Sequence, residues 1–351
     1  MTDKMEALVK VRAESAGSEF QRVPVPDYGK DEVLIKVKVA SICGTDVHIY
    51  KWNDWARTAF KVPRIYGHEY AGEVLAVGEN VKGIKIGDFV SGEGHIACGT
   101  CFNCRTGKKH ICYHLKCVGI DVSGAFAEYI VIPQENVWKN NPELPAELCS
   151  VQDPLGNAVH TVNSVDVRGK SVAIFGIGPI GAMTVSICRH SGAGKIFAID
   201  YNNPQRCAMA KKLRADIIID SAEVDPVKTI LDATDNEGVD IVFEMSGAEL
   251  ALNNAFRILK PGGELSILGI YNKPVSLDIN NSIVLKYITV RGIFGRIMFD
   301  TWYRMNELLK LTSFREDILS IITHKFRFSE FFDAMNVAAS ANAGRVVMKM
   351  E

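Results

Sequence analysis

The chain has 351 residues, of which 47% are hydrophobic and 23% charged, a composition typical of a globular protein long enough for two domains. With a formal net charge of −1, the composition shows no strongly basic character that would point to nucleic acid, so we expect no nucleic-acid partner. We also expect neither export nor a membrane span. The first residues lack an apolar secretory segment, and the long uncharged run 171–188 contains three glycines and a proline.

The first segment, residues 6–40, consists of short runs in which apolar and polar residues alternate, separated by glycine and proline. This pattern favours a β-rich, antiparallel start to the chain. The segment leads into residues 41–48, where metal-ligating and proton-carrying side chains cluster. The aromatic stretch 51–55 follows, and it is equally consistent with a surface loop and with a wall of a substrate site.

A first candidate metal site combines Cys43 with the pair His68-Glu69, which follows Gly67. Thiolate, neutral imidazole and carboxylate are the ligands of a zinc ion that keeps one coordination position open and can therefore act in catalysis. A histidine–glutamate pair alone is more often a core histidine beside a surface acid. The metal interpretation therefore depends on the motifs that accompany the pair along the chain.

A second candidate metal site lies in a lobe of about residues 93–117 and has the spacing C-x2-C-x2-C-x7-C, formed by Cys98, Cys101, Cys104 and Cys112. Four thiolates close a tetrahedral shell, which predicts a structural zinc in a lobe with few apolar residues. An iron–sulfur cluster is the alternative. The chain has nine cysteines and no secretory segment. This favours metal binding over disulfides and predicts a cytoplasmic protein.

A glycine-rich fingerprint marks a change of architecture. The apolar run 171–175 leads into Gly176, Gly178 and Gly181, a helical pattern follows, and the next strand ends at Asp200. The three glycines respectively allow a tight turn, close approach of a pyrophosphate, and helix–strand packing. The acid can bind the adenosine ribose and would repel a 2′-phosphate, so the motif predicts NAD rather than NADP.

The alternation of strands and helices continues beyond the fingerprint, and it predicts a doubly wound parallel sheet. Helices are expected at 204–213, 226–234 and 249–258, and strands at 217–219, 239–244 and 264–268. From about residue 296 the pattern becomes irregular and helical. We therefore expect a dinucleotide-binding domain at 156–295, inserted into a domain made of residues 1–155 and 296–351.

The order of these motifs resembles the zinc-containing medium-chain dehydrogenase/reductase superfamily over nearly the whole chain. The resemblance rests on Cys43-Gly44-Thr45-Asp46, Gly67-His68-Glu69, the four-cysteine lobe and the glycine fingerprint. It implies a Rossmann cofactor domain beside a β-rich GroES-like catalytic domain. It also implies NAD, one catalytic and one structural zinc per subunit, and a homotetramer.

The resemblance also implies roles for single residues. Cys43, His68 and Glu69 would hold the catalytic zinc. Thr45 and His48 match a proton relay, while Asp153 matches an acid near the metal and His95 a histidine at the substrate site. Further cofactor contacts are implied at Ile180, Asp200, Leu268, Gly269, Ile270, Ile293 and Phe294. The chain departs from the family at two positions. Gln205 stands where the family often has arginine, although the next residue is Arg206. Asp153 stands where many relatives have glutamate.

Stretches around His95, Asp153 and Trp302 resemble a narrower group within the superfamily. They imply a small-molecule substrate, L-threonine, whose 3-hydroxyl is oxidised to give 2-amino-3-oxobutanoate in threonine catabolism. The metal and cofactor motifs alone leave two alternatives. One is a polyol or secondary-alcohol dehydrogenase, and the other is a non-catalytic dinucleotide-binding protein, which the presence of all three zinc ligands disfavours.

Overall fold

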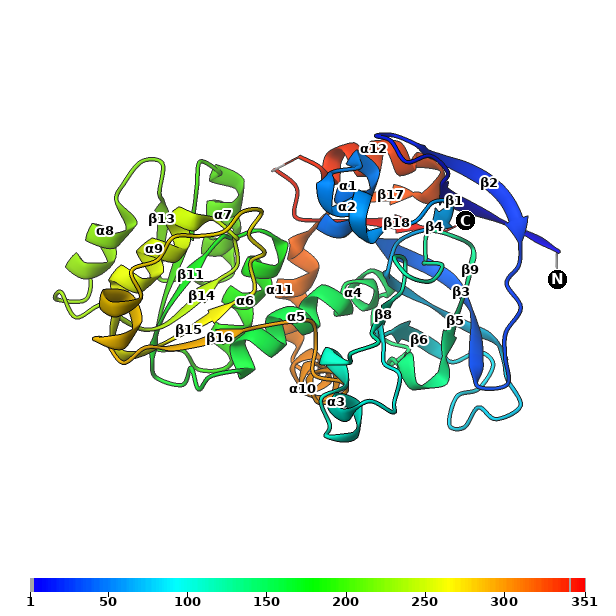
Figure 1. Ribbon diagram of the computed structural model, residues 1–351, viewed down its shortest axis with the longest axis horizontal. Helices are drawn as coiled ribbons and strands as arrows, with labels where there is room; N and C mark the ends of the chain where they lie inside the picture. The colour runs from blue at the N-terminus through cyan, green and yellow to red at the C-terminus, as the bar shows by residue number, and fades with distance from the viewer. Residues whose placement is uncertain (1–2, 341, 351) are drawn as a thin grey trace. The chain divides into compact units, whose positions relative to one another are not determined.

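The computed structural model describes residues 3–340 and 342–350, which fold into two compact units (Figure 1). The first unit comprises Met1–Pro154 and Ile322–Glu351, and the second comprises Leu155–Ile321. The chain thus returns to the first unit at Ile322 and not at the predicted residue 296. The reason lies in α11 (Thr312–Ile321), whose buried Asp317 accepts a hydrogen bond of 2.7 Å from the Ser186 hydroxyl on α6 (Pro179–His190).

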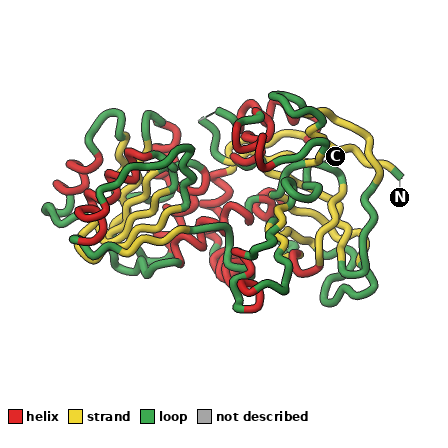
Figure 2. The backbone as a smooth tube through the Cα atoms, viewed as in Figure 1, coloured by secondary structure: helices red, strands yellow, loops and turns green. Residues whose placement is uncertain are grey.

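The first unit is built mainly from strands (Figure 2), and most of their pairings are antiparallel, as the alternating pattern of residues 6–40 predicts. Its largest sheet has the order β10-β6-β5-β3-β18-β17, with β9 also pairing with β3. The strands of this sheet are β3 (Glu32–Ser41), β5 (Glu69–Val77), β6 (Phe89–Gly92), β9 (Tyr129–Pro133), β10 (Val137–Lys139), β17 (Ile322–Arg327) and β18 (Arg345–Lys349). Two smaller sheets contain β1 (Lys4–Lys10), β2 (Ser18–Pro24) and β4 (Arg64–Ile65), and β7 (His95–Ile96) with β8 (Lys116–Cys117).

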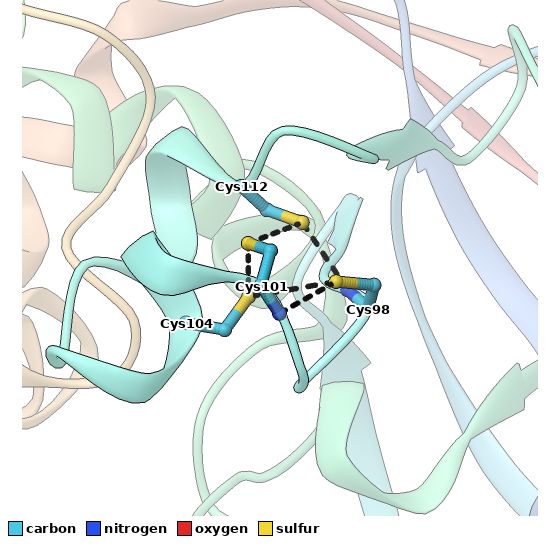
Figure 3. Close-up of side chains that lie close together, drawn as sticks. All are labelled: Cys98, Cys101, Cys104 and Cys112. Atoms are coloured by element: carbon cyan, nitrogen blue, oxygen red, sulfur yellow. Dashed lines mark hydrogen bonds between the residues drawn. The ribbon is translucent and has the colours of Figure 1, made fainter.

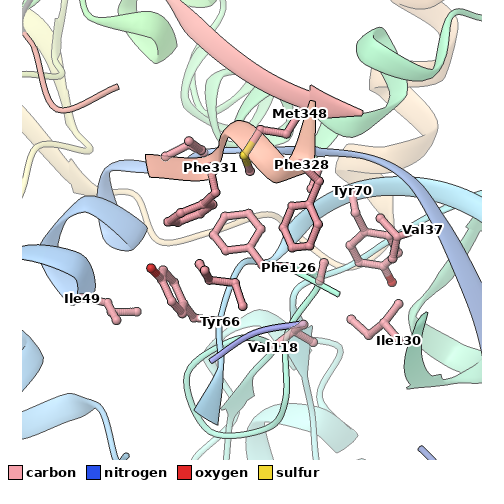
Figure 4. Packing of buried hydrophobic residues seen from close by; sticks show 14 of the residues in the cluster. Val37, Ile49, Tyr66, Tyr70, Val118, Phe126, Ile130, Phe328, Phe331 and Met348 are labelled. Carbon is pink, nitrogen blue, oxygen red and sulfur yellow. The ribbon is translucent and has the colours of Figure 1, made fainter. Parts of the chain in front are cut away.

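Aromatic side chains fill the core of the first unit (Figure 4). The ring of Phe126 lies 5.2 Å from that of Tyr66 and 5.4 Å from that of Phe331, both in edge-to-face geometry. Such pairs add to the free energy gained by burial, so they anchor the segments that carry them. The helices of this unit are α1 (Gly44–Lys51), α2 (Asp54–Ala59), α3 (Phe102–Arg105), α4 (Ala146–Ser150) and α12 (Phe331–Ala338), and α5 (Gln152–Asn163) begins in it.

The second unit contains a six-stranded parallel sheet in the order β13-β12-β11-β14-β15-β16, the doubly wound arrangement expected from the sequence. Its strands are β11 (Ser171–Phe175), β12 (Lys195–Asp200), β13 (Ile217–Asp220), β14 (Val239–Glu244), β15 (Leu259–Ile267) and β16 (Thr289–Gly292). Besides α6 and α11, its helices are α7 (Pro204–Lys212), α8 (Pro226–Asp232), α9 (Glu249–Ile258) and α10 (Asp300–Leu309).

The uncharged run 171–188 forms β11, the glycine turn and most of α6. Within the part of the chain that the structure describes, no helix has both the length and the apolar character needed to span a membrane. The expected strand at 264–268 is longer than predicted, because β15 already begins at Leu259 and pairs there with Val239 of β14.

Candidate active site

Cys43, His68 and Glu69 come together at one end of the main sheet. Ser41, the last residue of β3, lies opposite Glu69, the first residue of β5, in the antiparallel register. The chain then turns from β3 into α1 with Cys43 as its N-cap residue. One candidate ligand atom from each of the three residues lies within 4.8 Å of the others. The fold therefore gathers the ligand set that the sequence predicts.

Gly67 makes the turn that precedes His68. Its φ is +90°, a conformation that residues with a side chain rarely adopt. A Cβ atom at this position would also lie 2.6 Å from the ring of Phe126, which belongs to the aromatic core. The turn that presents the histidine therefore requires glycine both for its backbone conformation and for its packing.

The polar atoms of this cluster fit a bound cation. One oxygen of the buried Glu69 carboxylate accepts hydrogen bonds from the Ser41 hydroxyl and from the guanidinium of Arg345 on β18. Its other oxygen, Oε1, is buried without a hydrogen-bond partner in the protein. Nδ1 of His68 is likewise buried without a hydrogen-bond partner, and it lies 3.8 Å from the Asp46 carboxylate. Buried polar atoms without partners are costly, and a metal ion would satisfy the carboxylate oxygen.

Electrostatics at Cys43 depend on two residues that were not among the predicted site residues. Burial raises the pKa of the Cys43 thiol, and the charge of Asp46 raises it further, while Arg345 and the N–H of Thr45 lower it. Binding of a metal must displace the thiol proton, so metal affinity should increase with pH. The sequence contains Asp46 within a recognised motif, but no local signal identifies Arg345.

The proton-relay candidates Thr45 and His48 lie on α1, about one turn apart. His48 is exposed, and its Nδ1 lies 2.9 Å from Nδ2 of Asn53. Partial burial, with a smaller contribution from the Lys51 charge, lowers the pKa of His48. Its imidazole is therefore neutral at neutral pH and able to accept a proton.

Asp153 and His95 occupy different surroundings in the first unit. Asp153 is buried in the first turn of α5, and its charge raises the pKa of both the Cys43 thiol and the Tyr70 hydroxyl. This places it close enough to the thiol to act on it electrostatically. His95 lies on β7, at the base of the four-cysteine lobe, with Nδ1 at 4.0 Å from the Glu93 carboxylate.

The four-cysteine lobe has the geometry of a closed metal shell (Figure 3). The Sγ atoms lie 3.5 Å apart in Cys101 and Cys104, 3.8 Å apart in Cys101 and Cys112, and 4.0 Å apart in Cys98 and Cys104. A tetrahedron with metal–sulfur bonds of about 2.3 Å has edges of about 3.8 Å. The four thiols therefore fit a tetrahedral zinc ion.

Backbone N–H groups of the lobe point at its sulfur atoms. The N–H of Cys101 donates to Sγ of Cys98, and the N–H groups of Cys98 and His114 donate to Sγ of Cys112. Hydrogen bonds, chiefly from the N–H of Thr100 and of Cys101, lower the pKa of Cys98 to about 5. At neutral pH this residue is therefore a thiolate, the form that binds metal.

The glycine fingerprint connects β11 to α6. Gly176 has a φ of +89°, and a Cβ atom at Gly181 would lie 1.9 Å from the carbonyl oxygen of Gly176, so both positions require glycine. A Cβ at Gly178, the N-cap residue of α6, would meet no atom within 4 Å. The open side of Gly178 and the N-terminus of α6 fit the pyrophosphate of a dinucleotide. Ile180, a predicted cofactor contact, lies in the first turn of this helix.

Asp200 ends β12 beside this turn. Its carboxylate accepts hydrogen bonds from the N–H of Ile177 at 2.8 Å and from the N–H of Tyr201 at 2.7 Å, and it lies 3.7 Å from the guanidinium of Arg206. A cavity of about 140 Å³ opens next to it. Its lining includes Gly176, Asp200, Tyr201, Ser221, Ser246 and Leu250. The size and position suit the adenosine part of a dinucleotide.

The remaining predicted cofactor contacts lie at the carboxyl ends of β15 and β16. The N–H groups of Leu268 and Gly269 donate to the carbonyl oxygen of Glu244, and the N–H of Ile293 donates to that of Ile267. Side chains next to these bonds are accessible to a ligand, because Ile270 is 86% exposed and Phe294 51%. These predicted contacts therefore lie at the edge of the sheet where doubly wound proteins bind nucleotides.

Comparison with known proteins agrees with this geometry. Residues 29–144 match the alcohol dehydrogenase GroES-like domain, and residues 179–311 match the zinc-binding dehydrogenase family. The chain is 46% identical to an L-threonine 3-dehydrogenase of Caldanaerobacter subterraneus over 99% of both chains. It is 44% identical to that of Pyrococcus abyssi over 100% of both, and 42% identical to that of Bacillus subtilis over 98% of both.

Solved structures also resemble the whole chain. An alcohol dehydrogenase from Thermus sp. ATN1 superposes with a TM-score of 0.87 at 30% identity, covering 99% of this chain and 100% of that one. The 2R,3R-butanediol dehydrogenase of Bacillus subtilis superposes with a TM-score of 0.85 at 27% identity, covering 98% of this chain and 99% of that one. Both domains of the present chain therefore have counterparts in single dehydrogenase chains.

Proposed function

Because the chain belongs to the zinc-containing medium-chain dehydrogenase family, as a relative of L-threonine 3-dehydrogenases, we propose that it oxidises the 3-hydroxyl of L-threonine with NAD. The product is 2-amino-3-oxobutanoate. The observation that carries this proposal is identity of 41–46% with curated L-threonine 3-dehydrogenases over at least 98% of this chain. The metal-ligand cluster of Cys43, His68 and Glu69 supports a catalytic role and argues against a purely nucleotide-binding protein.

Cys43, His68 and Glu69 would hold the catalytic zinc, which, when bound with an open position, supplies Lewis-acid chemistry at the substrate hydroxyl. The Asp46 carboxylate lies 3.8 Å from Nδ1 of His68, where its negative charge favours a bound cation. Arg345 and Ser41 occupy one oxygen of Glu69 and leave Oε1 for the metal. These surrounding residues therefore hold the ligands in place before any metal arrives.

Removal of the hydroxyl proton is the step in which this chain's side chains act directly. Thr45 accepts the proton at its hydroxyl and passes a proton towards His48, about one helical turn further along α1. His48 is exposed and releases the proton to solvent. Its lowered pKa suits this role, because the imidazole must be neutral to accept a proton.

L-Threonine is a zwitterion, so its ammonium and carboxylate both need partners in the site. The buried carboxylate of Asp153 lies near Cys43 and suits the ammonium group. His95 is a candidate donor to the substrate carboxylate. A polyol would leave these partners unsatisfied, which is why we favour an amino-acid substrate over a polyol.

The test of the proposed substrate compares kcat/KM for L-threonine, D-threonine, L-serine, sorbitol and 2,3-butanediol. L-Threonine should give the highest value, about tenfold or more above sorbitol, since a polyol leaves buried charged partners unpaired. The series is repeated with His95→Ala, which should affect threonine more than butanediol. Faster turnover of sorbitol than of L-threonine would refute the assignment. An equal loss on threonine and butanediol would remove only the role of His95.

The relay predicts a specific defect in His48→Ala. Zinc content should remain normal, while kcat falls by about tenfold or more because the proton loses its acceptor. The defect should grow as pH falls, since release of the proton to solvent becomes harder. Metal analysis and a pH profile of kcat test this prediction. Loss of the catalytic zinc in this variant would instead identify His48 as a ligand.

Asp200 is proposed to select NAD over NADP. The family often has an arginine at the position of Gln205, and we propose that the neighbouring Arg206 makes the adenosine-side contact instead. Asp200→Ala should reduce the NAD preference by about tenfold, because repulsion of a 2′-phosphate disappears and the Arg206 guanidinium is released. The measurement is the ratio of kcat/KM for the two cofactors. Asp200→Asn is the control that removes the charge with little change in shape. A native preference for NADP would refute this interpretation.

We further propose a homotetramer in the cytoplasm. The strand β16 forms an edge of the parallel sheet, and large apolar side chains on or near it are exposed, namely Val284, Leu285, Tyr287 and Val290. Exposed apolar residues beside a sheet edge favour association between copies, which light scattering can measure. Within the described residues the nine cysteines form no disulfide bond, which suits a reducing compartment.

A further inference from the structure

Glu244 is a fully buried carboxylate at the carboxyl end of β14. Its Oε1 accepts hydrogen bonds from the N–H of Ser246 at 2.8 Å, from the N–H of Gly247 at 3.0 Å and from the Ser246 hydroxyl. Its Oε2 accepts the Tyr271 hydroxyl at 2.7 Å. An ionised carboxylate can only accept hydrogen bonds, and all these partners are donors, so they suit the ionised form.

The charge of this carboxylate is not balanced by a neighbouring cation. Among the residues that the structure describes, no lysine, arginine or histidine lies within ion-pair distance of Glu244, and every described hydrogen-bond partner is neutral. A buried charge stabilised only by neutral donors keeps its electrostatic influence on nearby groups, because solvent screens it weakly.

The network also joins the segments that carry the predicted cofactor contacts. The carbonyl oxygen of Glu244 accepts the N–H groups of Leu268 and Gly269. A Cβ atom at Gly269 would lie 2.4 Å from Oε2 of Glu244, so the 268–270 segment rests directly on the carboxylate. A Cβ at Gly176 would lie 2.8 Å from Cβ of Ser246, which brings the glycine fingerprint to the same network.

The order of the strands indicates which half of the cofactor lies above Glu244. Asp200 ends β12 on one side of the central strand β11, and Glu244 ends β14 on the other side. A dinucleotide crosses the carboxyl edge of such a sheet with its two halves on opposite sides. With adenosine in the cavity at Asp200, the nicotinamide half would lie beyond it, towards the 268–270 segment that rests on Glu244.

We propose that Glu244 determines the preference of this site for the oxidised over the reduced cofactor. The nicotinamide ring carries a positive charge when oxidised and none when reduced, so a buried anion below it stabilises bound NAD and leaves bound NADH unaffected. This bias favours binding of the oxidant and release of the reduced product. The inference rests on the proposed use of NAD, but it does not depend on which alcohol is oxidised.

The test measures Kd for NAD and for NADH by calorimetry on the zinc-loaded enzyme without any alcohol substrate. Glu244→Gln removes the charge while keeping the shape, because its amide oxygen can accept from the backbone and its amide nitrogen can donate to the Tyr271 oxygen. The ratio Kd(NAD)/Kd(NADH) should increase about fivefold. Tyr271→Phe removes one hydrogen bond and keeps the charge, so both Kd values should increase together with an unchanged ratio.

Weakening of both cofactors by the same factor in Glu244→Gln would overturn the proposal and leave Glu244 only a role in shaping the loops. If that variant does not fold, Tyr271→Lys replaces the hydroxyl that donates to Oε2 with an ammonium group and so places a cation beside the same carboxylate. The ratio should then rise in the same direction, and an unchanged ratio would again refute the proposal. A native enzyme that binds neither cofactor would refute the use of NAD itself. Failure to oxidise threonine would leave these measurements valid.

Discussion

Replacement of His68 by alanine is expected to abolish L-threonine oxidation, with a fall in kcat/KM of roughly a thousandfold or more. The physical reason is that two remaining ligands, Cys43 and Glu69, do not complete the site for a catalytic zinc. The zinc content should drop to about one ion per chain, held by the four-cysteine lobe. Binding of NAD should persist, since its proposed site lies in the other compact unit.

The control for this prediction is His324→Ala. His324 is a partly buried histidine on β17 of the same compact unit, and its Nδ1 lies 2.8 Å from the Thr323 hydroxyl. This variant should retain both zinc ions and its activity. A His68→Ala protein that keeps two zinc ions and normal turnover would show that the cluster of Cys43, His68 and Glu69 is not the catalytic metal site.

Cys101→Ser is expected to cause the largest loss of stability. Removing one thiolate opens the closed shell of the lobe, which depends on metal binding because it has little apolar surface to bury. The Tm should fall by at least about 5 °C, and one zinc ion per chain should be lost. Turnover per folded molecule should change much less, since the proposed catalytic ligands Cys43, His68 and Glu69 remain.

Cys117→Ser is the matched control, because Cys117 on β8 lies outside the four-cysteine spacing. It should retain both zinc ions and nearly the native Tm. A Cys101→Ser protein with unchanged stability and metal content would refute the structural zinc. Iron in place of zinc in the native protein would favour the iron–sulfur alternative.

Much of the fold and of the candidate site could be predicted because the relevant signals are local. Three of the four cysteines in the lobe are separated by only two residues each, so short turns and N–H···S hydrogen bonds bring them together. The glycine fingerprint and Asp200 lie on consecutive elements, and their roles follow from the backbone space that glycine leaves at Gly176 and Gly181. The alternation of strands and helices likewise predicts the parallel sheet.

The sequence by itself therefore determined the class of each domain, the nucleotide motif and the residue types of the candidate metal sites. Only the tertiary structure decided the pairing of β3 with β5, which brings Cys43 to His68 and Glu69, and the position of Arg345 beside Glu69. It also placed the chain's return at Ile322 and buried Glu244 among neutral donors. These features depend on sheet register and burial, which are set by contacts between residues far apart in the chain, and no short stretch of sequence encodes them.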